Sequence, residues 1–335
     1  MTEQQGTQQA QSRKKAEGNV VSVVAAIASN VLVGIFKFIV AGITGSSALV
    51  SEGIHSIVDS GNGILVLLGI KRSKKAPDLE HPFGYSQELY FWVFIVSILI
   101  FALGGGFSIY EGYTHLRDVV PGQPMGDPTL SYVVLGVAAV IEGTSLFVAV
   151  KNFNAARGSM SPAQFIHEAK DPSLFTVVLE DSAAELGLLI AFVGTLVGHA
   201  TNNPYVDGIA SVCIGLLLCG VAIILLRETK GLLIGEGLKA SEVREVEAIV
   251  EKNPAVVECG RILTFYLGPQ DLLVNLDVTF AKDATRDDIV QAVDEIEDAV
   301  TERFPAASRI FIESESLRQT RRGAARRDDA ISRLG

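Results

Sequence analysis

Long apolar blocks separated by short polar segments run from Val20 to about Leu226, and ordinary mixed sequence follows from Glu228 onward. A helix needs about 20 apolar residues to cross a hydrocarbon core of about 30 Å. Six blocks have this length, and we predict membrane spans at 20–43, 48–70, 89–110, 130–150, 173–198 and 206–226. Helices are expected because lipid offers no partner to backbone N–H and C=O groups.

The distribution of basic residues indicates how these spans are oriented. Lysine and arginine cluster before the first block (RKK, 13–15), between the second and third (KRSKK, 71–75), between the fourth and fifth, and after the sixth. The loops on the other side contain Arg117 as their one basic residue. Because basic loops stay cytoplasmic, we predict a multi-pass protein of the cell membrane with cytoplasmic N- and C-termini.

The sequence after the last apolar block predicts a small soluble domain. Its periodicity indicates helix, strand, strand, helix and strand, with Val274, Leu276 and Val278 on one side of a strand and Ile296 and Val300 on one helical stripe. We therefore predict a six-helix transmembrane domain over 19–227 and a cytosolic α/β domain over 228–316. The flanking segments 1–18 and 317–335 are too poor in apolar residues to form a core, and we expect disordered tails.

Ionisable residues inside the spans are the candidate chemistry, because such residues usually face a bundle interior or an ion path. In SEGIHSIVDSGN the residues Glu52, His55, Asp59 and Asn62 follow at spacings of three, four and three, so they share one helical face. His55 and Asp59 are separated by one helical turn and can offer a nitrogen and an oxygen to the same ion. Glu52 and Asn62 are candidates for the ion path.

The fifth span, TVVLEDSAAELGLLI, is also acidic. Asp181 and Glu185 share a face, whereas Glu180 is turned by about 100° and is expected to point elsewhere unless the helix rotates. If the second and fifth spans pack together, His55, Asp59 and Asp181 form most of a tetrahedral N/O site suited to zinc or a neighbouring divalent metal. The competing interpretation is that these residues are buried hydrogen-bond partners between helices.

Two further charged residues lie inside spans. Glu142, in the middle of the fourth span, is either another acid on the ion path or a protonated residue paired with a neighbouring helix. Lys37, in the first span, is expected to extend its ammonium group to the membrane interface.

The order of these features resembles the cation diffusion facilitator family. The HxxxD of the second span, the acidic fifth span, the loop sequence HPFGYSQE and the segment GPQDLLVNLDVTF all resemble family sequence, and the resemblance covers roughly residues 20 to 316. The LEDS sequence of the fifth span resembles the subgroup of zinc transporter 9-like proteins.

The resemblance implies a homodimeric exporter of divalent cations, commonly zinc, driven by proton antiport. It also implies a metallochaperone-like cytosolic domain and places His55, Asp59 and Asp181 at ligand positions. Val177 stands where the family has a further ligand and cannot bind metal. Whether Glu180, Glu185, water or another span supplies the fourth ligand stays open.

Two auxiliary metal sites of the family are expected to be weak or missing. In the loop, Asp78 and His81 match two ligands, but Tyr85 stands in place of the third, so we expect His81 to order the loop instead. No histidine follows His199, and we predict a C-terminal dimerisation domain without a histidine zinc site.

The expected function is therefore divalent-cation efflux. The histidine ligand favours zinc over manganese, and cobalt, nickel and iron(II) stay open as alternatives. The expected partners are the metal ion, protons, the lipid bilayer and a second copy of the chain, with no permanent cofactor and no nucleic acid. We expect no enzymatic activity, since HExxH and other protease motifs are missing. The alternatives are a metal-dependent membrane enzyme and a metal-regulated scaffold that has lost transport.

Overall fold

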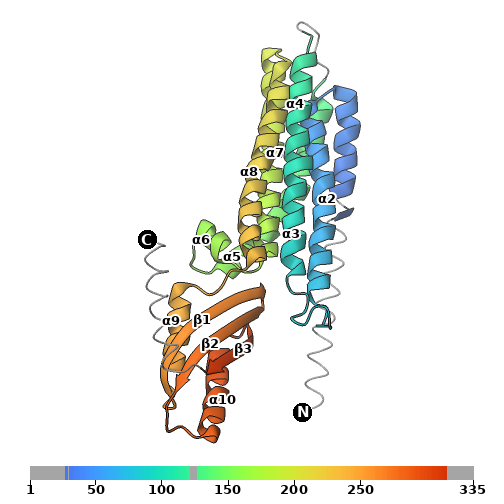
Figure 1. Cartoon of the computed structure of the whole chain (residues 1–335). Coiled ribbons are helices and arrows are strands. Elements are labelled where there is room, and N and C mark those ends of the chain that lie inside the picture. Colours follow the sequence, from blue (N-terminus) through green and yellow to red (C-terminus); the bar gives the residue numbers. More distant parts are fainter. Residues whose placement is uncertain (1–26, 29, 121–126, 315–335) are drawn as a thin grey trace, which may run out of the picture. The chain divides into compact units, whose positions relative to one another are not determined.

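The computed structural model describes residues 27–28, 30–120 and 127–314 (Figure 1). The chain divides into two compact units. One holds the chain up to Lys71 together with Leu89–Lys230, and the other holds Arg72–Glu88 together with the chain from Gly231 onward. The predicted tails, 1–18 and 317–335, lie outside the described residues.

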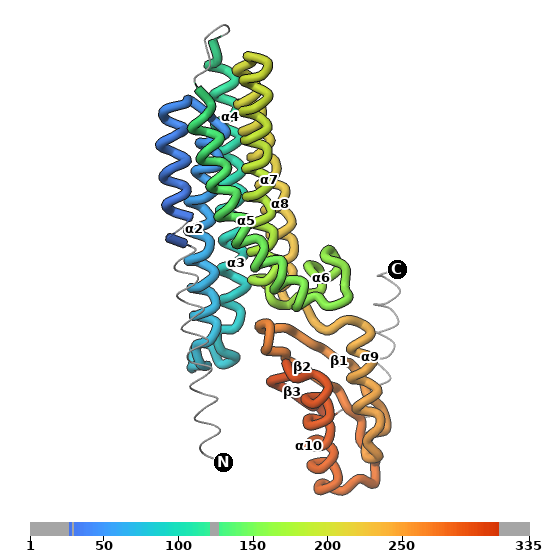
Figure 2. The backbone as a smooth tube through the Cα atoms, turned by 180° about the vertical axis from the view of Figure 1, so that it is seen from behind, coloured from blue at the N-terminus to red at the C-terminus, as the bar shows by residue number. Residues whose placement is uncertain are grey.

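The first unit is a bundle of long helices that run side by side (Figures 1 and 2). A shorter apolar helix, Asn30–Thr44, precedes five helices that are long and apolar enough to cross a membrane. These five are α2 (Ser47–Ser73), the continuous α3 (Glu88–Leu99), η1 (Ile100–Gly106) and α4 (Phe107–Asp118), then α5 (Thr129–Arg157), α7 (Pro172–Thr201) and α8 (Tyr205–Ile234). The short α6 (Pro162–Glu168) joins α5 to α7. Spans two to six therefore lie where the hydropathy pattern predicts them, and part of the first lies outside the described residues.

Glycines bring the continuous helix α3–η1–α4 close to α8. A Cβ at Gly112 would lie 2.7 Å from the carbonyl oxygen of Gly208, and one at Gly215 would lie 2.8 Å from that of Gly105. Small residues at helix interfaces let two backbones approach in this way. The same stretch contains the π-helical turn η1 in the sequence IFALGGG, a wider turn that occurs as a local insertion within longer helices.

The second unit has the predicted order of elements: α9 (Ala240–Val250), β1 (Val256–Gly268), β2 (Asp271–Phe280), α10 (Arg286–Arg303) and β3 (Ala307–Ser314). The sheet order is β1-β2-β3, with β1 and β2 antiparallel and β2 and β3 parallel. Val274, Leu276 and Val278 pack with Ile296 and Val300 of α10 in one apolar core. The small α/β domain is thus confirmed.

The loop 72–88 belongs to this second unit, although we placed it within the membrane domain 19–227. Ser86 Oγ donates a hydrogen bond to Asp271 Oδ2 at 2.8 Å, and Arg309 Nη2 donates to the carbonyl oxygen of Phe83 at 3.1 Å. These partners are 185 and 226 residues apart in sequence, so no local pattern could have indicated the contact.

Candidate metal-ion site

The polar face of α2 is directed into the helix bundle, as the spacing predicts. Glu52, His55 and Asn62 are buried, and Asp59 keeps 13% of its side chain exposed. His55 Nε2 lies 3.3 Å from Asp59 Oδ2. Within the part of the chain that the structure describes, neither His55 Nε2 nor Asp59 Oδ1 has a hydrogen-bond partner.

This pair has the chemistry of a partial metal site. Buried nitrogen and oxygen atoms are nearly always hydrogen-bonded, so two unpaired atoms at one place call for a ligand. An imidazole nitrogen and a carboxylate oxygen are donors that zinc and its neighbours bind. The pair therefore fits a divalent cation as cargo.

On α7 the acid that faces α2 is Glu180. It is buried, and its Oε1 accepts a hydrogen bond from Asn62 Nδ2 at 2.9 Å. The expectation that Glu180 points elsewhere is therefore wrong. The 3.6-residue period shows which residues of a helix share a face but not which face meets a given neighbour.

The other acids of α7 are directed toward α5. Asp181 Oδ2 accepts a hydrogen bond from Ser145 Oγ at 2.8 Å. A Cβ at Gly143 would lie 3.0 Å from Glu185 Oε1. Val177 is 40% exposed, so the missing family ligand at this position leaves no gap inside the bundle.

The predicted residues are thus brought together only in part. His55 and Asp59 are adjacent, Glu180 reaches their helix through Asn62, and Asp181 is held by α5. No three His, Cys, Asp or Glu side chains are grouped closely enough to hold a metal ion in the described ranges, which leave out 1–26, 29, 121–126 and 315–335. The bundle presents His55 and Asp59 as a candidate ligand pair, with acids on neighbouring helices.

Lys37 is fully buried, so the expectation that it reaches the interface is wrong. Its Nζ donates hydrogen bonds to Glu142 Oε1 at 2.9 Å, to Ser56 Oγ at 3.0 Å and to Glu52 Oε2 at 3.1 Å. Glu142 is therefore paired with a neighbouring helix. A signal was available, because Lys37 is the one lysine or arginine within the six apolar blocks and a buried acid needs a counter-charge.

The loop residues Asp78 and His81 organise the loop in this structure. Asp78 Oδ2 accepts hydrogen bonds from Tyr85 Oη at 2.6 Å and Lys75 Nζ at 2.9 Å, and its Oδ1 accepts from the backbone N–H of His81 at 2.8 Å. The Tyr85 hydroxyl, followed by the Lys75 ammonium, holds the pKa of Asp78 well below its usual value. Both carboxylate oxygens of Asp78 thus have partners within the loop.

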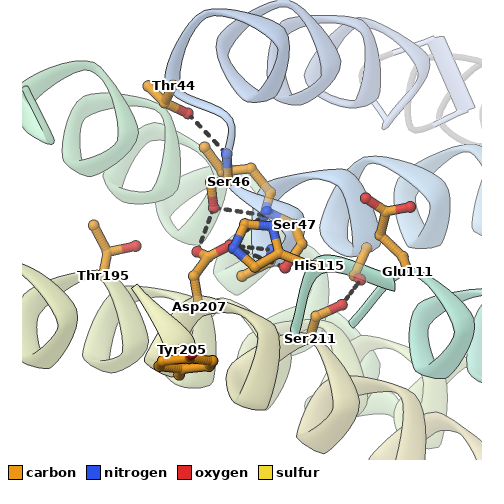
Figure 3. A network of polar contacts seen from close by, with 12 residues as sticks. Thr44, Ser46, Ser47, Glu111, His115, Thr195, Tyr205, Asp207 and Ser211 are labelled. Carbon is orange, nitrogen blue, oxygen red and sulfur yellow. Dashed lines mark hydrogen bonds and ion pairs between the residues drawn. The ribbon is translucent and has the colours of Figure 1, made fainter. Parts of the chain in front are cut away.

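Asp207 of α8, which sequence reasoning missed, anchors the first turn of α2 (Figure 3). Its carboxylate accepts hydrogen bonds from Ser46 Oγ at 2.6 Å, from Ser47 Oγ at 2.9 Å and from the backbone N–H of Ala48 at 3.2 Å. A carboxylate stabilises a helix at this end by satisfying its free N–H groups. The anchor helps to set the rotation of the ligand-bearing helix.

The fold and the acid-rich interior define a multi-pass membrane protein with polar groups assembled between its helices. The sequence model of the cation efflux transmembrane domain matches residues 23–234. The chain therefore belongs to the cation diffusion facilitator, or cation efflux, family.

Curated relatives support the zinc transporter 9-like subgroup. The human "Proton-coupled zinc antiporter SLC30A9, mitochondrial" is 35% identical over 244 residues, which are 72% of this chain and 42% of the relative. "Metal tolerance protein C4" of Arabidopsis thaliana is 33% identical over 261 residues, 77% of this chain and 56% of the relative. "Manganese efflux system protein MneS" of Bacillus subtilis is 22% identical over 262 residues, 76% of this chain and 80% of the relative. The chain spans about half the length of the first two.

Proposed function

We propose that this protein is a divalent-cation efflux transporter that exchanges metal for protons and binds the ion in the membrane between α2 and α7. The histidine ligand favours zinc as the metal. The observation that carries the proposal is the buried pair of His55 Nε2 and Asp59 Oδ1, which lack hydrogen-bond partners among the described residues. Membership of the cation efflux family and the names of the two relatives from human and Arabidopsis thaliana support it.

In this proposal α2 supplies His55 and Asp59, and α7 supplies an acid. Glu180 faces α2 in this conformation, and Asp181 lies one residue further around the helix. A rotation of α7 by about 100° would exchange the two. Glu185 is the more distant candidate for the fourth ligand.

Proton exchange follows from the ligand chemistry. An imidazole must be neutral and a carboxylate ionised to bind metal, so protons compete directly with the ion. When rocking of the helices exposes the site to the far side of the membrane, protonation of His55 or Asp59 releases the ion. The protons then leave on the metal-loading side.

We also propose a homodimer joined through the C-terminal unit, with cell-membrane location and cytoplasmic termini. The Lys/Arg-rich segments 13–15 and 71–75 support this orientation. The human relative is named as mitochondrial, so labelling of engineered surface cysteines in intact cells is the measurement that checks location and topology.

The test of the proposed function is metal flux in proteoliposomes with an imposed pH gradient, using a panel of zinc, cobalt, nickel, iron(II) and manganese. Asp59→Asn and His55→Ala should each lower zinc flux by at least about tenfold because a direct ligand is lost. Ile64→Ala on α2 and Leu189→Ala on α7 change exposed residues and serve as matched controls.

Full transport by Asp59→Asn would refute the site. Metal binding without flux in the unmodified protein would instead support the scaffold, and metal-dependent peptide cleavage would support the enzyme.

A further inference from the structure

A second polar cluster, built around Lys37, lies beside the ligand pair and is not used by the proposed mechanism. The Lys37 ammonium has three N–H donors, and all three are engaged, by Glu52, Ser56 and Glu142. Lys37 and Glu52 are completely buried, and Glu142 is 8% exposed. Glu52 is three residues before His55, so the cluster lies about one helical turn from the ligand pair.

The acids of this cluster have more oxygen atoms than the ammonium can satisfy. Glu52 Oε1, Glu142 Oε2 and Glu185 Oε1 are buried and have no hydrogen-bond partner within the described part of the chain. Glu52 Oε1 is directed at Gly187 of α7, where a Cβ would collide with it, and Glu185 Oε1 approaches Gly143, the neighbour of Glu142. Carboxylates from α2 and α5 therefore converge on one cation from the helix Asn30–Thr44, and Glu185 of α7 lies nearby, against the residue next to Glu142.

Converging carboxylates with a serine hydroxyl would bind a metal if they were left alone. The carboxylates of Glu52 and Glu142 and the hydroxyl of Ser56 form an oxygen-rich ligand set of the kind that divalent cations accept, with water completing the coordination. A metal ion bound there, one helical turn from His55, would be withheld from the transport site. The ammonium group of Lys37 occupies this position instead and supplies the positive charge that the acids need.

We propose that Lys37 is a specificity-determining residue whose ammonium group permanently occupies a cation site formed by Glu52 and Glu142, so that a divalent metal binds at His55 and Asp59 and not at these acids. The inference rests on the proposed function for its biological meaning. Whether the Lys37 ammonium occupies a metal-binding position can be tested by measuring metal binding alone, without a transport assay.

The test is equilibrium zinc binding to purified protein in detergent, measured by competition with a chromogenic chelator, in a His55→Ala/Asp59→Asn background. In this background the proposed transport site is disabled. Adding Lys37→Met should create about one new zinc site per protomer, because Glu52 and Glu142 lose their cation. Lys37→Arg keeps the charge and should add none.

The roles of Glu52 and Glu142 are tested in the same His55→Ala/Asp59→Asn background. Adding Glu52→Gln and Glu142→Gln to Lys37→Met should remove the new site, because the remaining ligands are too few. A folded Lys37→Met variant that binds no more zinc than its parent overturns the proposal. A failure of the proposed function would appear differently, as a lack of flux in the unmodified protein.

Folding of the variants gives a second readout, followed by circular dichroism and gel filtration. If Lys37→Met is not recovered folded, Lys37→Gln carries the binding test, because it removes the charge and keeps both Glu52 and Glu142, and binding of no additional zinc by it overturns the proposal. If only Lys37→Met/Glu52→Gln/Glu142→Gln is recovered folded, the proposal is supported, because the ionised acids then require a cation and their neutral amide replacements do not. Loss of all three variants overturns it, because packing of the Lys37 side chain would be the requirement.

Discussion

At the scale of single residues, neighbouring acids on α7 have different partners. Glu180 is held by Asn62 on α2, and Asp181 is held by Ser145 on α5. Groups that hydrogen-bond a ligand orient it and tune its basicity. Asn62 and Ser145 are therefore positioning residues for two different candidate ligands, and they can be compared directly.

Replacing these two positioning residues should reveal which acid serves the ion. Asn62→Leu removes the donor to Glu180, and we expect the KM for zinc flux to rise by about tenfold with a smaller change in the maximal rate. Ser145→Ala removes the donor to Asp181 and should have the weaker effect. The opposite order would assign the third ligand to Asp181 and would remove Glu180 from the site.

At the scale of elements, the long helices are positioned by close backbone contact and by polar anchors at their ends. The α4 segment and α8 meet at glycines, where Gly112 lies against Gly208 and Val212. Asp207 ties the first turn of α2 to α8. The glycine contacts thus fix α4 against α8, and the Asp207 anchor fixes the start of α2 against α8.

Gly112→Ala should destabilise the protein although alanine is the better helix former. A Cβ at this position would lie 2.7 Å from a carbonyl oxygen and from a valine methyl, and such overpacking costs about 1–3 kcal/mol. Gly136→Ala on α5 is the matched control, because no atom lies within 4 Å of its added Cβ, and its gain in helix propensity is about 1 kcal/mol. Thermal unfolding in detergent should show the two variants shifting in opposite directions; a shift in the same direction would argue against the tight contact.

At the scale of the whole molecule, the two units do not follow the division of the chain into apolar and polar halves. The loop 72–88 connects two membrane helices, but it is grouped with the C-terminal sheet. Asp271 is the centre of this attachment, since it accepts hydrogen bonds from Ser86 of the loop and from Ser308 and Arg309 of β3. The second unit is therefore assembled from two distant segments.

Asp271→Ala should loosen the loop without unfolding the sheet. The substitution removes the acceptor of Ser86 and the partner of Arg309, so we expect faster amide hydrogen exchange across residues 80–88 and little change in β2. Asp283→Ala, at an exposed position of the same unit, is the control. Unchanged exchange in the loop would show that Asp271 does not hold it.

The sequence by itself determined the features that depend on local periodicity. Hydropathy located spans two to six, the spacing of Glu52, His55, Asp59 and Asn62 predicted a shared inward face, and alternation predicted the order of elements in the C-terminal unit. These predictions hold because chain length across lipid and the helical and strand periods depend on neighbouring residues alone.

Only the tertiary structure decided which faces meet. It turned Glu180 toward α2 and Asp181 toward α5, buried the Lys37 ammonium among acids of two other helices, and joined the loop 72–88 to a sheet from the far end of the chain. The physical reason is that the rotation of a helix and the partner of a buried charge are set by packing and charge balance across the whole bundle, which no single segment encodes.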